Sequence, residues 1–148
     1  MLRSLSVSLA LVIGGVSATA IAADDPIMVR KLIMRSNGGA AGVAGGMMKG
    51  EIAFDAKVAT AAIRTLNAAA YTVGNYFPAG SETGMKTRAS PKIWQDMAGF
   101  EAKLAQFQKD TDAAAAAKPA DLEAFKAAVG PVLANCKGCH ETYQLPKE

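Results

Sequence analysis

The chain has 148 residues, which is enough for one domain, and 51% of them are hydrophobic, which excludes a wholly disordered chain. Two cysteines are too few for a disulfide scaffold, and the formal net charge of +3 is spread over scattered lysines and arginines. A protein that binds nucleic acid usually carries a denser basic stripe, so we expect no nucleic-acid partner.

The first 22 residues have the features of a secretory signal peptide. Arg3 supplies a short positive region, an apolar stretch covers residues 5–16, and alternating small residues lead to Ala22. A membrane anchor is the alternative, but the apolar stretch is shorter than the roughly 20 residues that a spanning helix needs. We therefore expect cleavage at Ala22 or one residue later and export to the periplasm. The mature domain, 23–148, then has no transmembrane segment and, without Arg3, a net charge of +2.

The first predicted helix of the mature chain covers residues 26–48. Asp25 and Pro26 form a favourable helix start, with a capping carboxylate followed by proline at the first helical position. Glycines within this segment lower its helix propensity, so a flexible loop is the alternative. We favour a helix, because small residues on one face would let a bulky group lie against it. That face would contain Met34, Gly38, Ala41, Gly45 and Met48.

Three further helices are predicted near residues 56–76, 91–116 and 121–145. In the last two, apolar residues recur at intervals of three and four, which is typical of antiparallel bundles. No segment alternates convincingly with period two, so we expect no sheet. Because short connections join long helices, sequential helices should be antiparallel neighbours. The sequence therefore predicts an all-α antiparallel four-helix bundle.

The two cysteines and the single histidine of the chain lie within five residues, in the segment Cys136-Lys137-Gly138-Cys139-His140. This order, C-x-x-C-H, is the attachment motif for one covalent haem c. Helix positions three apart share a face, so both thiols can add to the haem vinyl groups and the next imidazole can bind the iron. We expect Cys136 and Cys139 to hold the haem and His140 to be an axial ligand.

Other roles for this cluster explain less. A thioredoxin-like redox pair belongs at a helix N-terminus in a βαβ pattern, and a structural zinc site needs four ligands. A disulfide between the two cysteines would leave the histidine without a role. No nucleophile remains beside a free base, and no glycine-rich phosphate loop follows a strand, so we do not expect an enzyme.

The position of the motif on the last helix resembles that in the class II cytochromes c, the cytochrome c′ family. The resemblance covers essentially the whole mature chain and includes residues 30–34, 49–51, 90–94 and 136–143. It implies a left-handed up-down-up-down four-helix bundle, with the haem between the helices near one end. It also implies a periplasmic electron-transfer or gas-binding protein, either a monomer or a homodimer.

The same resemblance suggests roles outside the motif. Met34 matches the position that faces the distal side of the haem, where its flexible thioether would reach the iron as the sixth ligand. Arg30 would lie near a haem propionate, Glu82 in a loop near the haem edge, and Trp94 beside the haem. A surface arginine and a core tryptophan are the alternatives for two of these. Gln144 departs from the family, which often has arginine four residues after the haem histidine.

Two functions remain open on these grounds. In the first, iron bound by histidine and methionine carries single electrons between redox partner proteins in the periplasm. The low-spin cytochrome c-556 branch of the family, which residues 32–35 and 90–94 resemble, works in this way. In the second, five-coordinate high-spin iron binds NO or CO. Two haem propionates would bring the charge of +2 close to zero, so we expect no strong long-range steering of a partner.

Overall fold

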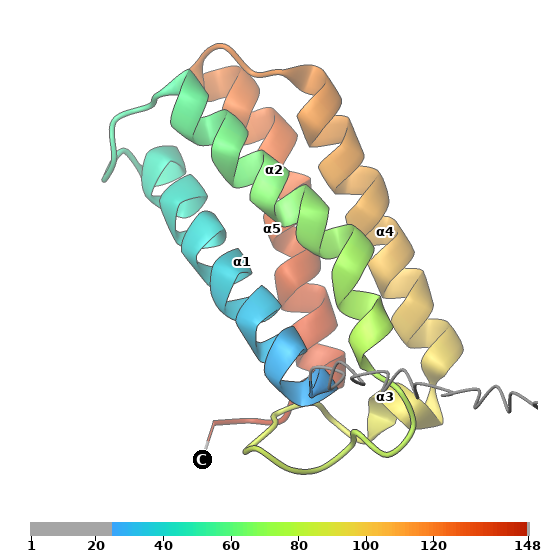
Figure 1. The fold of residues 1–148 in the computed structure, drawn as a ribbon. Helices are drawn as coiled ribbons and strands as arrows, with labels where there is room; N and C mark the ends of the chain where they lie inside the picture. Colours follow the sequence, from blue (N-terminus) through green and yellow to red (C-terminus); the bar gives the residue numbers. More distant parts are fainter. Residues whose placement is uncertain (1–24, 148) are drawn as a thin grey trace, which may run out of the picture.

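The computed structural model describes residues 25–147, and the predicted signal peptide, 1–22, lies outside them. Long helices joined by loops run up, down, up and down, which confirms the predicted four-helix bundle (Figure 1). Between residues 25 and 147 no residue belongs to a β-strand, and no helix is long and apolar enough to cross a membrane. The elements are α1 (Pro26–Lys49), α2 (Ala56–Thr72), the 3₁₀ helix η1 (Val73–Tyr76), α3 (Lys92–Gln95), α4 (Met97–Ala117) and α5 (Leu122–Tyr143).

The two ends of the bundle differ in their connections. At what we call the closed end, residues 50–55 join α1 to α2 and residues 118–121 join α4 to α5 (Figure 1). At the open end, residues 77–91 connect η1 to α3, and the chain finishes just beyond α5. The larger hydrophobic core includes Phe125, which packs against Phe54 from the closed end with 5.8 Å between ring centroids. A smaller core of Ile93, Phe100 and Tyr143 lies at the open end.

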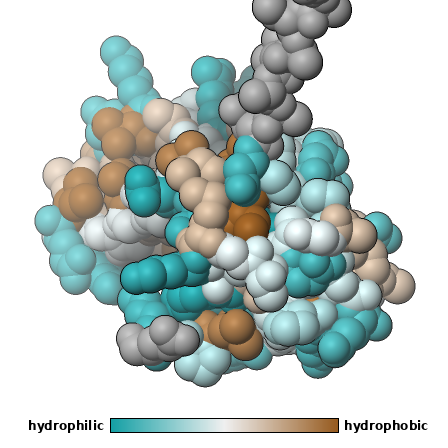
Figure 2. Space-filling view, turned by 60° about the horizontal axis from the view of Figure 1, so that its bottom comes forward, coloured by the Kyte–Doolittle hydropathy of each residue, from teal (hydrophilic) through white to brown (hydrophobic). Residues whose placement is uncertain are grey.

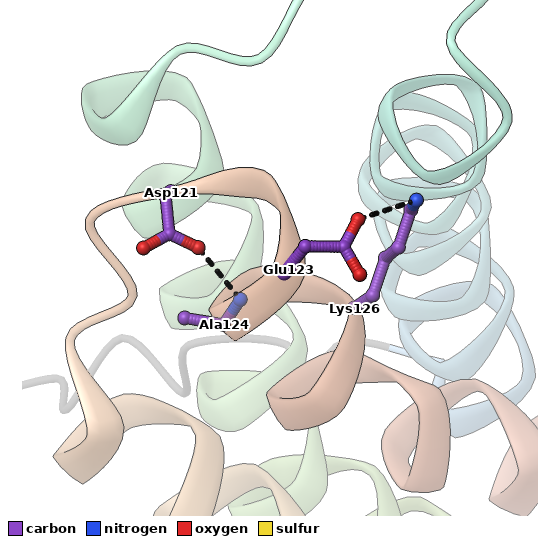
Figure 3. Close-up of polar contacts among 4 residues, drawn as sticks. All are labelled: Asp121, Glu123, Ala124 and Lys126. Carbon is purple, nitrogen blue, oxygen red and sulfur yellow. Dashed lines mark hydrogen bonds and ion pairs between the residues drawn. The ribbon is translucent and has the colours of Figure 1, made fainter.

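Aspartate side chains begin all four long helices. Each carboxylate accepts hydrogen bonds from backbone N–H groups of the first turn, which helix ends leave without partners. In α5, Asp121 accepts from the backbone nitrogen of Ala124 at 2.8 Å, and Glu123 forms an ion pair with Lys126 at 2.9 Å (Figure 3). The four caps are Asp25, Asp55, Asp96 and Asp121.

The glycine-rich segment after Asp25 is helical throughout, which confirms a helix instead of a flexible loop. A Cβ atom added at Gly38, Gly39, Gly42 or Gly45 would meet no atom within 4 Å, so these glycines border open space. Gly50 then ends α1 in the left-handed conformation, with φ of 75°.

The predicted third helix, residues 91–116, is interrupted. Asp96 separates α3 from α4 because its φ of −138° and ψ of 57° are not helical, and its carboxylate accepts from the Tyr143 hydroxyl at 2.8 Å. Gly99 is required beside this pair, since a Cβ there would collide with the Asp96 carboxylate and the Tyr143 hydroxyl. The predicted second helix also changes, to 3₁₀ geometry after Thr72. Apolar periodicity continues across both irregularities, which is why it did not reveal them.

Candidate functional site

The C-x-x-C-H segment lies in the last turns of α5, at the open end of the bundle. Both thiols are free and partly buried. Burial raises the pKa of Cys136 and of Cys139, and it lowers the pKa of His140, to which the nearby positive charge of Arg88 also contributes. The imidazole is therefore held in its neutral form, which is the form that binds a metal.

Two adjoining cavities open beside this segment. Their volumes are about 360 Å³ and about 200 Å³. The larger cavity opens toward the loop of residues 77–91, and the smaller one lies between α1, α4 and α5. Both cavities are bordered by Met34, Val73, Leu104, Cys139 and His140.

The walls of both cavities are largely apolar. Phe77, Ile93 and Phe100 line the larger one, and Phe107 lines the smaller one. At this end of the molecule, hydrophobic residues reach the surface between hydrophilic ones (Figure 2). Most small-molecule and cofactor sites have this composition, with an apolar wall and a few placed polar groups.

Asn37 is a buried polar residue in the wall of the smaller cavity. It is 8% exposed, and its Oδ1 is buried without a hydrogen-bond partner among residues 25–147. A buried acceptor of this kind indicates a further group in the site. Two thiols, a neutral imidazole, a thioether and this acceptor therefore border one apolar space, and this set fits haem c.

The structure brings Met34 of α1 to the same cavities as His140 of α5. Gly38 and Ala41, from the predicted small-residue face, border the smaller cavity, whereas Gly45 and Met48 border neither. Met34 is 37% exposed, so its side chain is not packed into the protein core. Ligation of iron by Met34 remains a prediction.

Arg30 borders the larger cavity but is bound to the protein itself. The residue is 3% exposed, and its guanidinium donates to Tyr76 O at 3.0 Å, to Ser81 Oγ and O at 2.9 and 2.6 Å, and to Thr87 Oγ1 at 3.0 Å. The same group lies over the Phe77 ring, 4.8 Å from its centroid. Arg30 thus fixes the loop to α1. Among residues 25–147 its Nε–H has no hydrogen-bond acceptor, so a propionate contact remains a prediction.

Sequence reasoning missed this structural role. The available signal was spacing, because Arg30 lies three residues after Ile27 and seven before Asn37, both of which are buried. An arginine on the buried face of a helix requires acceptors from another segment.

Glu82 and Trp94 border neither cavity. Glu82 accepts from the backbone nitrogen of Gly80 at 3.0 Å. Trp94 packs against Phe77 and donates from Nε1 to the carbonyl oxygens of Phe77 and Pro78, both at 3.2 Å. Trp94 therefore supports the cavity wall from behind, and contact of either residue with the haem stays a prediction.

The chain end is attached to the loop by a short pairing that we call the clasp, residues 88–90 with 143–145. The backbone nitrogen of Ser90 donates to Tyr143 O at 3.0 Å, and that of Leu145 donates to Arg88 O at 2.8 Å. The guanidinium of Arg88 donates to Leu145 O at 2.7 and 3.0 Å. Gln144 borders the larger cavity within the clasp, and Arg88 supplies a positive charge close to His140.

Comparison with known proteins agrees with this geometry. The family model described as Cytochrome C' matches residues 25–144. A cytochrome c-556 from Agrobacterium fabrum is 35% identical over 96% of this chain and 96% of its own. A cytochrome c′ from Rhodopseudomonas palustris is 36% identical over 88% of this chain and 89% of its own. A solved cytochrome c′ structure from Rhodopseudomonas palustris superposes with a TM-score of 0.80 at 35% identity and covers 85% of this chain and 100% of that one.

Proposed function

The chain belongs to the cytochrome c′ family and carries haem c, and from this premise we propose that it transfers single electrons through an iron ligated by His140 and Met34. The haem supplies an iron that changes between the Fe(III) and Fe(II) states. One observation carries the proposal: the two candidate ligands come from different helices and border the same two cavities.

The residues of α5 hold and orient the group. Cys136 and Cys139 would hold the haem through two thioether bonds, and the neutral imidazole of His140 would bind its iron. Hydrogen bonding of Tyr143, one turn beyond Cys139, to Asp96 fixes the end of α5 against α4. The motif is therefore presented from a helix whose last turn cannot fray freely.

The residues of α1 line the side of the site that faces α5. Met34 brings a flexible thioether, and Gly38 and Ala41 leave room beside it for a planar group. A thioether ligand favours the reduced iron, and two protein ligands leave no open coordination position. Apolar walls such as Phe100 and Phe107 keep water from the site, which suits transfer of an electron without bond changes.

Binding of NO or CO is the second candidate function. The exposure of Met34 favours it, since a side chain outside the core can turn away and leave the iron five-coordinate. The unpaired Oδ1 of Asn37 then borders a cavity large enough for a diatomic ligand. In either case, we propose that the protein works in the periplasm.

Absorption spectra of the oxidised and reduced protein test the proposal. The wild type should be low-spin in both states, show a near-infrared methionine–iron band when oxidised, and bind CO poorly. Met34→Ala should become high-spin and bind CO. Met28→Ala is the matched control, because Met28 is an exposed methionine of α1 that borders neither cavity. A high-spin wild type that takes up CO readily would favour the gas-binding function instead.

A further inference from the structure

Positively charged side chains surround the larger cavity. Among residues 25–147, no aspartate or glutamate lines this cavity. Two of the cations come from the loop and the others come from α1. We call this set the basic rim, and it consists of Arg30, Lys31, Arg35, Lys86 and Arg88.

Hydrogen bonds of the basic rim leave its charge uncompensated. Lys31 Nζ donates to the carbonyl oxygen of Met85 at 2.6 Å, and Arg88 donates to that of Leu145. The four acceptors of Arg30 are carbonyl and hydroxyl oxygens, all neutral. Within residues 25–147 no member of the rim forms an ion pair. Burial lowers the pKa of Arg30, and the nearby carboxylates of Asp25 and Glu82 offset part of this shift, but both lie outside the cavity wall.

The loop that supplies two of these cations is held in place. Met85 and Lys86 have φ of 45° and 50°, a left-handed conformation that residues other than glycine rarely adopt. Strained backbone persists only where surrounding contacts determine it. Here the bond from Lys31 to Met85 on one side and the clasp on the other provide those contacts. The backbone that carries Lys86 and Arg88 is therefore fixed beside the cavity.

Away from the rim, local ion pairs occur at both ends of the bundle, including Lys137 with Glu141 on α5 at 3.7 Å. Lys49 lies 3.9 Å from Glu51, and Lys126 lies 2.9 Å from Glu123. The small net charge of the chain therefore hides an uneven distribution. Our expectation of weak steering followed from net charge alone, and it does not take into account that five cations lie around one cavity.

We propose that the basic rim is the docking surface for an acidic electron-transfer protein. This inference rests on the proposed electron-transfer function and names the chemistry of its partner. Two haem propionates would offset two of the five charges, which leaves the rim positive. Apolar cavity walls of low dielectric focus such a field and raise the encounter rate with an oppositely charged partner.

Ferricyanide, a trianion, is the first probe. One electron passes from reduced haem iron to ferricyanide, which becomes ferrocyanide, and no atom is transferred. The rate constant should fall as ionic strength rises, because salt screens attraction between unlike charges. With the trication tris(phenanthroline)cobalt(III) as oxidant, the rate constant should instead rise as ionic strength rises, because salt screens repulsion between like charges. A ferricyanide rate constant that is independent of ionic strength would overturn the proposal.

Charge-reversal variants distinguish the effect of the rim on the rate constant from the effect of the net charge of the protein. Arg35 and Lys86 are exposed and make no hydrogen bond or ion pair to other side chains in the described part of the chain, so Arg35→Glu with Lys86→Glu should fold normally. At low ionic strength this pair should slow oxidation by ferricyanide about tenfold. Lys57→Glu with Lys109→Glu changes the net charge equally and should stay within about twofold of the wild type. Equal slowing in both pairs would contradict docking at the rim.

A titration of the reduced holoprotein with poly-L-glutamate, followed by NMR of backbone amides, locates the surface directly. The amides of residues 31–35 and 85–88 should shift, and those of 118–126 should not. Shifts spread over both ends, or no shifts, would overturn the proposal. A high-spin spectrum with CO uptake would instead overturn the electron-transfer function, and the ferricyanide rates would still report the charge of the rim.

Discussion

Polar contacts at the closed end of the bundle are local, and its distant residues meet through apolar packing such as Phe54 on Phe125, whereas the open end adds hydrogen bonds between segments far apart in the sequence. At the closed end, Asp121 caps a backbone N–H three residues away, and Glu123 pairs with Lys126 at the same spacing. At the open end, Arg30 bonds to Tyr76, 46 residues away, and Arg88 bonds to Leu145, 57 residues away. Local contacts begin the helices, whereas the long-range hydrogen bonds fix the loop and the chain end beside the larger cavity.

The closed end therefore contributes mainly to stability, whereas the open end forms the candidate site. The closed end carries the larger core, in which Phe125 and Val129 have no exposed surface. The open end leaves apolar wall beside a cavity of about 360 Å³ and places charged groups around it. Substitutions at the two ends should therefore have different consequences.

Phe125→Ala should disrupt the packing of the core at the closed end, and it should have the largest effect on stability. Removal of a fully buried aromatic ring leaves a cavity and should lower the free energy of unfolding by about 3–5 kcal/mol. Chemical denaturation measures the loss. The absorption spectrum of the folded variant should remain that of the wild type, because Phe125 borders neither cavity. Val58→Ala, at an exposed site of α2, should change stability by less than about 0.5 kcal/mol.

Arg30→Ala should release the loop of residues 77–91 from α1 at the open end. It leaves buried acceptors in the loop without a donor and should lower the free energy of unfolding by about 2–3 kcal/mol. Limited proteolysis should then cut within residues 77–91, which the wild type protects. Arg64→Ala is the control, because Arg64 is an exposed arginine of α2, and it should have little effect. Equal proteolysis of wild type and Arg30→Ala would show that other contacts hold the loop.

Asp121→Ala, which removes a local contact of the closed end, should have the smallest effect of the three substitutions. Loss of this helix cap should cost about 1 kcal/mol, measured as a shift of the denaturation midpoint. Glu123→Ala, two residues away, removes only an exposed ion pair and should cost less than about 0.5 kcal/mol. If the two variants lose the same stability, the cap is not what begins α5.

Much of the fold could be predicted from the sequence because its determinants are local. Asp25 followed by Pro26 marks the start of α1, and periodic apolar residues indicate α4 and α5. The haem motif is likewise contained in five consecutive residues. The break at Asp96 was not predicted, since it depends on Tyr143, 47 residues away.

The candidate site was predicted only in part for the same reason. Met34 and His140 do border the same cavities. The basic rim and the internal bonding of Arg30 depend on how the loop folds back on α1, and no spacing in the sequence encodes this path. Total charge, which the sequence does provide, says nothing about where the charges gather.

The clasp also bears on the order of events during folding. Its partners Arg88 and Leu145 are 57 residues apart, so closing it has a higher loop-closure entropy cost than forming a helix turn. Contacts between distant segments are expected to form after local ones. The segment around Cys139 should therefore stay accessible while the helices assemble, which leaves an interval in which its thiol can be modified before the wall beside it closes.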